Sequence, residues 1–390
     1  MDGVELFDVA GRFPGGRGFS GAACDGRYVY LAPLNNGQLH GQVARFDTTL
    51  AFDDPAAWAS FDSATVHADS RGFVDAIYDG RYLYLVPYFN GCHHGQVTRY
   101  DTRQPFAAAG SWQVFDSATL HPGSRGFVSG CFDGRHVYLA PYQLDHTTTN
   151  GQVTRFDTQG DFLDPAAWQV FDTSGVHPDS RGFHSAVPAG DYVYFVPYLR
   201  QGNEYSGLLA RYDRRLPFDD PVAWRHFDLT TLAPGCKGYV GGMCHDGMLY
   251  LSPYVDGTDR HGRAVRYDTR RELDDAKAWT WFDCARVDAG SRGFFGAIHA
   301  GRHLYFIPHC RGVGQYHGQI TRCDLTKPFD DPASWSFCDL AEAHPDCRGF
   351  IGGVVHGGHL YLPPFETDAG RHSGLAARID VDQEGIWRQK

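Results

Sequence analysis

The stretch SRGFVDAIYDGRYLYLVPY, residues 70–88, recurs with small changes seven times along the chain. Each copy carries one basic residue near its start, and these residues are Arg17, Arg71, Arg125, Arg181, Lys237, Arg292 and Arg348. The steps between them are 54, 54, 56, 56, 55 and 56 residues. A fixed period of this size is the signature of a solenoid, a propeller or another repeat array. Because the repeat runs from end to end, the sequence predicts one closed body.

One copy contains the pattern of four short β-strands. Residues 72–79 are rich in strand-forming residues, and the Asp-Gly pair at 79–80 is a hairpin signal. Residues 81–88 alternate in polarity, and 95–102 and 112–117 supply the third and fourth strands after polar loops. Four antiparallel strands in a repeat of this length are typical of a propeller blade. We therefore predict an all-β fold, a seven-bladed β-propeller of four-stranded antiparallel blades.

The two ends of the chain together complete the last blade. Trp387 matches the tryptophan that begins the fourth strand of other copies, and Phe7 and Asp8 match the pair that ends it. Residues 4–9 are therefore expected to supply the outer strand of blade seven, which protects edges that an open ring would leave unpaired. The predicted blades cover about 17–62, 71–116, 125–172, 181–228, 237–283, 292–339 and 348–387, the last completed by 4–9. The tryptophan of the recurring D-P-x-x-W loop is expected to fill the core between blades.

Composition excludes several classes of function. The 390 residues carry a net charge of -11, which provides no basic field for nucleic acid or an anionic membrane. The ten cysteines have no paired spacing, which favours reduced thiols and a cytoplasmic location. The first residues lack the pattern of a secretory signal, and no apolar stretch approaches the ~20 residues of a membrane span.

The second half of each copy resembles the kelch repeat. The stretches VTRYDTRQPFAAAGSW from Val97 and AVRYDTRRELDDAKAW from Ala264 are similar to the kelch strand that ends in Tyr-Asp, followed by a loop and a tryptophan. Pro-Tyr, as at 87–88, stands where kelch repeats have paired glycines. The chain thus looks like a kelch-like propeller of a divergent bacterial type. Kelch-like folds serve both enzymes and binding scaffolds, so the resemblance implies architecture alone.

The seven basic residues precede the strands that are expected to line the central channel. Their side chains would surround the channel mouth and repel one another unless anions neutralise them. In one interpretation the anions are the aspartates that end the fourth strands, namely Asp8, Asp62, Asp116, Asp172, Asp228, Asp283 and Asp339. In the other, the seven basic residues hold an anionic ligand through bidentate hydrogen bonds.

Histidines are expected to surround the same mouth. The loop between the second and third strands ends in a histidine in five blades, at His40, His94, His261, His317 and His372. Blades three and four break this pattern with Asn150 and Ser206 and have longer loops. A metal ion must lie about 2.0–2.1 Å from each imidazole nitrogen, so only two or three neighbouring histidines could share one. The candidate ligands of a divalent metal ion are His94, His261 and His317, with hydrogen bonding as the alternative.

A second histidine set precedes the basic residue by four positions, at His67, His121, His177 and His344. We interpret these four as shaping the loop that connects one blade to the next.

Three residues interrupt the repeat and are the candidate catalytic groups. Asp75 and His184 stand among small or apolar residues of the first strand, and His309 replaces the tyrosine that follows proline in other blades. Neighbouring cations would lower the pKa of His184, which suits it to act as a general base. Asp75 could act as a base or as a ligand. The alternative for each is a structural group whose hydrogen bonds are satisfied.

Three functional hypotheses remain open. The first is the binding, and non-redox transformation by a lyase, isomerase or hydrolase reaction, of an anionic small molecule or sugar acid at the channel mouth. The second is a scaffold for a protein partner. The third is a lectin-like carbohydrate binder with one site per blade. The broken symmetry of blades three and four favours one off-axis pocket over seven equivalent ones.

Overall fold

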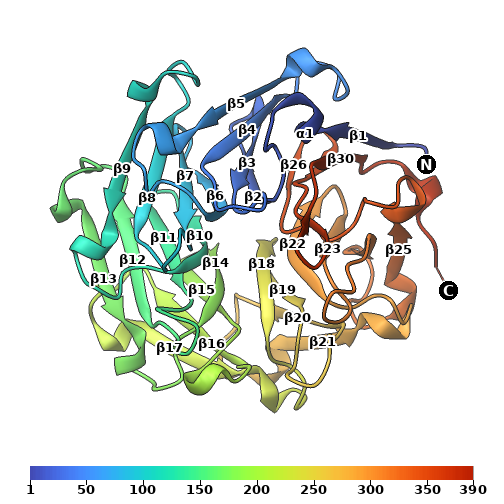
Figure 1. The fold of residues 1–390 in the computed structure, drawn as a ribbon. Coiled ribbons are helices and arrows are strands. Elements are labelled where there is room, and N and C mark those ends of the chain that lie inside the picture. The colour runs from blue at the N-terminus through green and yellow to red at the C-terminus, as the bar shows by residue number, and fades with distance from the viewer. Residues whose placement is uncertain (390) are drawn as a thin grey trace.

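The computed structural model describes residues 1–389, which form seven four-stranded antiparallel sheets arranged in a ring (Figure 1). The predicted seven-bladed β-propeller is therefore confirmed. We number the blades in chain order, from the sheet that begins with β2 to the sheet that begins with β26. In every blade the first strand lies innermost and the fourth lies outermost.

The strands follow one order in all blades. The first strands are β2 (Phe19–Cys24), β6 (Phe73–Tyr78), β10 (Phe127–Phe132), β14 (Phe183–Ala189), β18 (Tyr239–His245), β22 (Phe294–Ala300) and β26 (Val354–His356). The second strands are β3 (Tyr28–Pro33), β7 (Tyr82–Pro87), β11 (His136–Pro141), β15 (Tyr192–Pro197), β19 (Met248–Pro253), β23 (His303–Pro308) and β27 (His359–Leu362). The third strands are β4 (Gln42–Asp47), β8 (Gln96–Asp101), β12 (Gln152–Asp157), β16 (Leu208–Asp213), β20 (Arg263–Asp268), β24 (Gln319–Asp324) and β30 (Leu375–Asp380). The fourth strands are β5 (Trp58–Asp62), β9 (Trp112–Asp116), β13 (Trp168–Asp172), β17 (Trp224–Asp228), β21 (Trp279–Asp283), β25 (Trp335–Asp339) and β1 (Val4–Asp8).

The remaining elements are short. A hairpin of β28 (Glu366–Asp368) and β29 (Arg371–His372) extends blade seven, and α1 (Val9–Arg12) follows β1. The 3₁₀ turns before the fourth strands are η1 (Pro55–Ala57), η3 (Ala109–Ser111), η5 (Pro165–Ala167), η8 (Pro221–Ala223), η10 (Ala276–Ala278) and η12 (Pro332–Ser334). Those after the fourth strands are η2 (Ser63–Thr65), η4 (Ser117–Thr119), η6 (Thr173–Gly175), η9 (Leu229–Thr231), η11 (Cys284–Arg286) and η13 (Leu340–Glu342). The last two are η7 (Gln201–Asn203) and η14 (Glu384–Ile386). Among residues 1–389, no helix is long and apolar enough to cross a membrane.

The N-terminal strand closes the ring as predicted. β1 pairs with β30 in antiparallel register, from Val4 opposite Ile379 to Asp8 opposite Leu375 (Figure 1). The other end of the chain reaches back to blade six, where Arg388 forms a bridge with Phe337. The two termini therefore link blade seven to both of its neighbours.

The loop tryptophans lie in the core between blades, as predicted. Trp112 of blade two is 3% exposed and stacks on Phe61 of blade one, with ring centroids 4.8 Å apart. Its indole Nε1 donates a hydrogen bond of 3.0 Å to the carbonyl oxygen of Phe106, six residues earlier. The same bond recurs in five other blades, so each tryptophan both fills the interface and fixes the loop that precedes it.

A bulge at the start of the first strand brings adjacent residues into the channel. In blade two, Phe73 lies opposite Pro87 but Asp75 lies opposite Val86, so Val74 is an extra residue. A regular strand would turn consecutive side chains to opposite faces, whereas a bulge redirects them. Val74 and Asp75 therefore both line the central channel.

Candidate functional site

An axial cavity of about 250 Å³ lies at the centre of the ring, lined by the first strands of blades one to six and by residues 351–353, directly before β26. Its polar side chains come from three consecutive blades and are Asp75, Ser129, His184 and Ser185. Most of the remaining wall is glycine, alanine or branched aliphatic residues. A Cβ atom on Gly241 would lie only 2.9 Å from the Cα atom of Gly296, so glycine is needed where these strands converge.

Asp75 is held in this cavity by two hydrogen bonds. Its Oδ2 accepts from the hydroxyl of Ser129 in blade three at 2.7 Å, and its Oδ1 accepts from the amide of Ala76 at 2.8 Å. Burial raises the pKa of the carboxyl group to about 6, although both hydrogen bonds lower it. Asp75 therefore carries a negative charge at neutral pH in an environment that opposes it.

His184 lines the cavity from blade four. Its side chain is 7% exposed and contacts the rings of Tyr142, Tyr198 and Phe295, with the Phe295 centroid 4.9 Å away. Burial lowers the pKa of the imidazole to about 3, so the ring is neutral at physiological pH. The sequence predicted this direction, but it assigned the cause to cations, and the structure shows desolvation.

The aromatic residues that follow the second strands form an arc above the cavity. Tyr88, Tyr142, Tyr198, Tyr254, His309 and Phe365 contact one another in sequence, with centroids 5.8–6.4 Å apart. Phe295 reaches from blade six to His184 of blade four and also touches His309. Burial lowers the pKa of His309 to about 3. None of the seven basic residues lines the axial cavity, so Asp75 and His184 do not share its wall with the arginines.

The seven basic residues surround the propeller face where the first strands begin, which we call the arginine face. Two of them form ion pairs, Arg292 with Asp259 at 2.8 Å and Arg348 with Asp368 at 3.7 Å. Arg181 instead donates to the side-chain oxygen of Gln201. Within residues 1–389, the others, Arg17, Arg71, Arg125 and Lys237, have no ion pair with a carboxylate.

The aspartates at the ends of the fourth strands have a different role from the pairing considered above. Asp62 accepts a hydrogen bond from the amide of Ala64 and caps η2, and Asp116 caps η4 in the same way. The equivalent residues cap η6, η9, η11 and η13, and Asp8 caps α1. The chain turns directly after each strand, and a short acceptor at the first turn satisfies an otherwise unpaired amide. In the part of the chain that the structure describes, none of these aspartates is ion-paired with a basic residue of the repeat.

The histidines of the arginine face bind the backbone of their own blades. His261 donates from Nε2 to the carbonyl oxygen of Lys237 at 2.9 Å and accepts from the amide of Arg263 at Nδ1. His317 uses both nitrogens in the same pattern, and His94 uses Nδ1. In blade three, Asn150 makes equivalent bonds to the carbonyl oxygens of Arg125 and Gly123.

This arrangement does not favour the predicted metal site. The candidate ligands His94, His261 and His317 belong to three blades, and the backbone engages Nδ1 of all three rings and Nε2 of His261 and His317. Among residues 1–389, no three His, Cys, Asp or Glu side chains are grouped so that they could hold a metal ion. Burial lowers the pKa of His94 and His261 to about 4 and that of His317 to about 3, which keeps the rings neutral.

The second histidine set shapes the loops between blades, consistent with the prediction. In His67, His121, His177 and His344, Nδ1 accepts a hydrogen bond from the amide two residues later.

A larger groove of about 740 Å³ lies on the arginine face at blade four. The loop of Arg200–Leu208 forms one side, and the connections that enter and leave blade four form the other. Its polar side chains are His177, Asp179, Arg200, Tyr205, Ser206, Asp228, Thr230 and Lys237. The long loop that broke the repeat pattern therefore lines this groove.

Some charged side chains of the blade-four groove have ion-pair or hydrogen-bond partners, and one has no carboxylate partner. Arg200 pairs with Glu204 and lies 3.6 Å from Asp179. Asp228 accepts from the amide and hydroxyl of Thr230 at 2.9 and 2.7 Å. Lys237, by contrast, has no carboxylate partner among residues 1–389.

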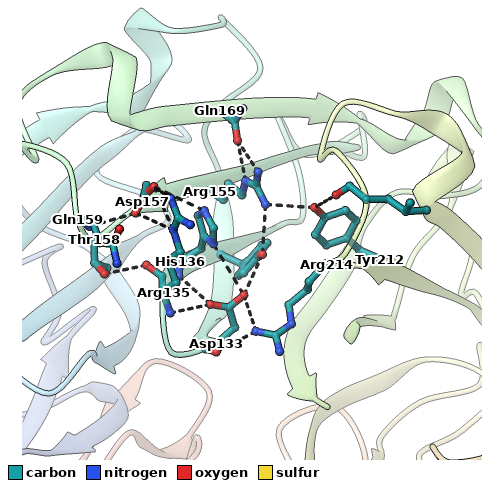
Figure 2. A network of polar contacts seen from close by, with 12 residues as sticks. Asp133, Arg135, His136, Arg155, Asp157, Thr158, Gln159, Gln169, Tyr212 and Arg214 are labelled. Carbon is teal, nitrogen blue, oxygen red and sulfur yellow. Dashed lines mark hydrogen bonds and ion pairs between the residues drawn. The ribbon is translucent and has the colours of Figure 1, made fainter. Parts of the chain in front are cut away.

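A polar network joins blades three and four near the opposite face (Figure 2). Asp133 forms an ion pair with Arg214 of blade four at 3.0 Å and accepts hydrogen bonds from the amides of Arg135 and His136. Burial opposes ionisation of Asp133, but these partners hold its pKa below the usual range. Arg155 donates to Gln169 and to Tyr212, so its donors are also engaged (Figure 2). We interpret this network as a joint between blades.

Sequence analysis missed several residues at these sites. Ser129 and Ser185 line the axial cavity where four other blades have glycine, and Phe295 also lines it and contacts His184. The blade-by-blade comparison that identified Asp75 contains the signal for both serines. Tyr205 lines the groove, but it lies in a loop whose length varies between blades.

No protein-family model matches this chain, and a search of curated proteins also finds no match.

Proposed function

We propose that the protein binds an acidic carbohydrate, such as an oligosaccharide of uronic acids, in the blade-four groove. The observation that carries the proposal is Lys237, a cation without a carboxylate partner among residues 1–389, at the edge of a groove of about 740 Å³. That volume falls within the roughly 300–1,000 Å³ of small-molecule sites. We also propose that the chain is related to kelch-like propellers, because the second half of each repeat resembles the kelch repeat.

The other groups in the groove suit the remaining parts of a sugar. Arg200 provides donors, His177 provides its second ring nitrogen, and Asp179 and Asp228 provide carboxylate acceptors for hydroxyl groups. Tyr205 offers an aromatic ring that packs at right angles on Tyr198, with centroids 5.4 Å apart. In ligand pockets, a small number of polar groups beside aromatic surface fixes the orientation of the ligand and provides specificity.

The arrangement supports one site rather than seven. Blade four has the loop that builds the groove, whereas blades one and two have short loops that end in a histidine bound to, or buried against, the backbone. We propose binding without catalysis, because the candidate catalytic residues Asp75, His184 and His309 do not line the groove.

Isothermal titration with an oligogalacturonide and with the matching neutral galactose oligomer tests this proposal. We expect the acidic oligomer alone to bind, with an affinity that falls as sodium chloride is raised, because salt screens the interaction with Lys237. Equal affinity for the two oligomers would contradict the proposal, and so would the absence of binding by the acidic oligomer at low salt.

A further inference from the structure

We infer that the axial cavity binds a small molecule that carries an ammonium group. This site is separate from the blade-four groove and does not depend on the function proposed for it. It is formed by the first strands of six blades and the residues directly before β26, whereas the groove is formed mainly by loops on the arginine face.

The charge of the cavity wall is the first reason. Asp75 is the carboxylate among the residues that line it, and neither lysine nor arginine contributes to the lining. Its hydrogen-bond partners, the hydroxyl of Ser129 and the amide of Ala76, are both neutral. A buried carboxylate without a cation is costly, and a bound cation would remove that cost.

The direction of the hydrogen bonds is the second reason. Ser129 donates its single hydroxyl proton to Asp75, so the contact of 3.4 Å between the hydroxyls of Ser129 and Ser185 requires Ser185 to donate. The proton chain therefore runs from blade four to blade two and ends on the carboxylate. The oxygen atoms of these three side chains therefore have lone pairs, but no free proton, for a ligand. An ammonium group has three donors and no acceptor, which complements them.

The imidazole of His184 is the third reason. Its side chain is 93% buried, since 7% is exposed, and it lines the cavity. Within residues 1–389, its ring nitrogens have no hydrogen-bond partner in another residue. The neutral ring has one nitrogen that carries a lone pair, which gives the cavity wall a second kind of acceptor.

The opposite wall fits a short hydrocarbon chain. Phe295, Val240 and Ile351 contribute apolar surface, and Phe295 also presents an aromatic ring, which attracts cations. The cavity of about 250 Å³ is smaller than the roughly 300–1,000 Å³ of sites for drug-sized molecules. We therefore expect a primary amine with only a few carbon atoms.

The full-length protein can be tested with n-propylamine and its uncharged counterpart n-propanol. Like a lysine side chain, the amine is protonated at pH 7.5. We expect it to raise the melting temperature and to bind at least about tenfold more tightly than the alcohol. Potassium chloride at the same concentration serves as the third arm. Equal effects of amine and alcohol would overturn the inference, and so would an effect of potassium that matches the amine.

Variants then locate the site. Asp75→Asn keeps the size of the side chain but removes its charge, and it should abolish the preference for the amine. Asp259→Asn is the control, since this carboxylate lies on the arginine face beside Arg292. If Asp75→Asn does not fold, lowering the pH to 5 with the parent protein gives the same test, because protonation of Asp75 should weaken amine binding. A preference that persists in Asp75→Asn or at pH 5 would contradict the inference.

Discussion

Phe7 of the N-terminal strand stacks on Trp58 of blade one, with ring centroids 4.7 Å apart and planes 5° apart. Phe7 belongs to the outer strand of blade seven, because β1 pairs with β30. In the next interface, Phe61 stacks on Trp112 with centroids 4.8 Å apart. The interface that closes the ring is thus built like the others, although Phe7 and Trp58 both come from the N-terminal part of the chain.

We predict that removal of residues 1–8 destabilises the whole propeller. The deletion would expose the edge of β30 and remove the partner of Trp58. Thermal melting and light scattering should show a lower melting temperature and aggregation. The single change Phe7→Ala should lower the free energy of unfolding by about 3–5 kcal/mol. Phe61→Ala is the matched control and should cost a similar amount. A deletion variant that melts like the parent would contradict closure by β1.

The loop tryptophans should contribute to stability through their hydrogen bonds as well as their size. Trp224→Phe would leave the carbonyl oxygen of Phe218 without the indole donor, now at 3.1 Å, in a buried position. We expect a loss of about 1–3 kcal/mol in the free energy of unfolding by denaturant titration. Trp281 is 39% exposed, and Trp281→Phe serves as the control, with little expected change. Equal effects of the two changes would argue against the bond.

The buried histidines should make the protein sensitive to acid. The pKa of His261 is lowered from its ordinary value of 6.5 to about 4 by burial, so the folded state resists protonation. The unfolded chain takes up the proton between these values, and stability therefore falls as pH decreases from about 6.5 to 4. His261→Asn copies the bonding of Asn150 and removes this group.

Denaturant titrations at pH 7 and pH 4.5 measure this effect. Between the two values, the variant should lose about 2–3 kcal/mol less than the parent, which corresponds to one shifted group. If both proteins lose the same stability, His261 is not the neutral, backbone-bound residue described above.

Much of the fold could be predicted from sequence because the same strand pattern occurs in seven copies. The alternation in residues 81–88, the Asp-Gly turn and the match of Phe7 and Trp387 to other blades together determine the number of blades and their closure. The strand pattern within each repeat and the match between the two chain ends predict the same closed ring of blades.

The candidate sites could be predicted only in part. Asp75 and His184 break the repeat, and both line the axial cavity. The bulge at Val74 and the turn after Asp62 are local backbone features that composition does not reveal. They decide which side chains face the channel and divert the aspartates from the arginines to helix caps. The contacts of His184 with Tyr142, Tyr198 and Phe295 depend on packing across three blades, which spacing alone does not encode.

Binding of an oligogalacturonide to a Lys237→Gln variant tests the proposed function most directly. Lys237 is the unpaired cation at the groove, and its loss should weaken binding by about 1.5–3 kcal/mol in isothermal titration while the melting temperature stays the same. Arg17→Gln is the matched control, because Arg17 occupies the same repeat position in blade one and does not line the groove. The account predicts weakened binding for Lys237→Gln alone. Unchanged affinity of Lys237→Gln, or an equal loss in both variants, would contradict it.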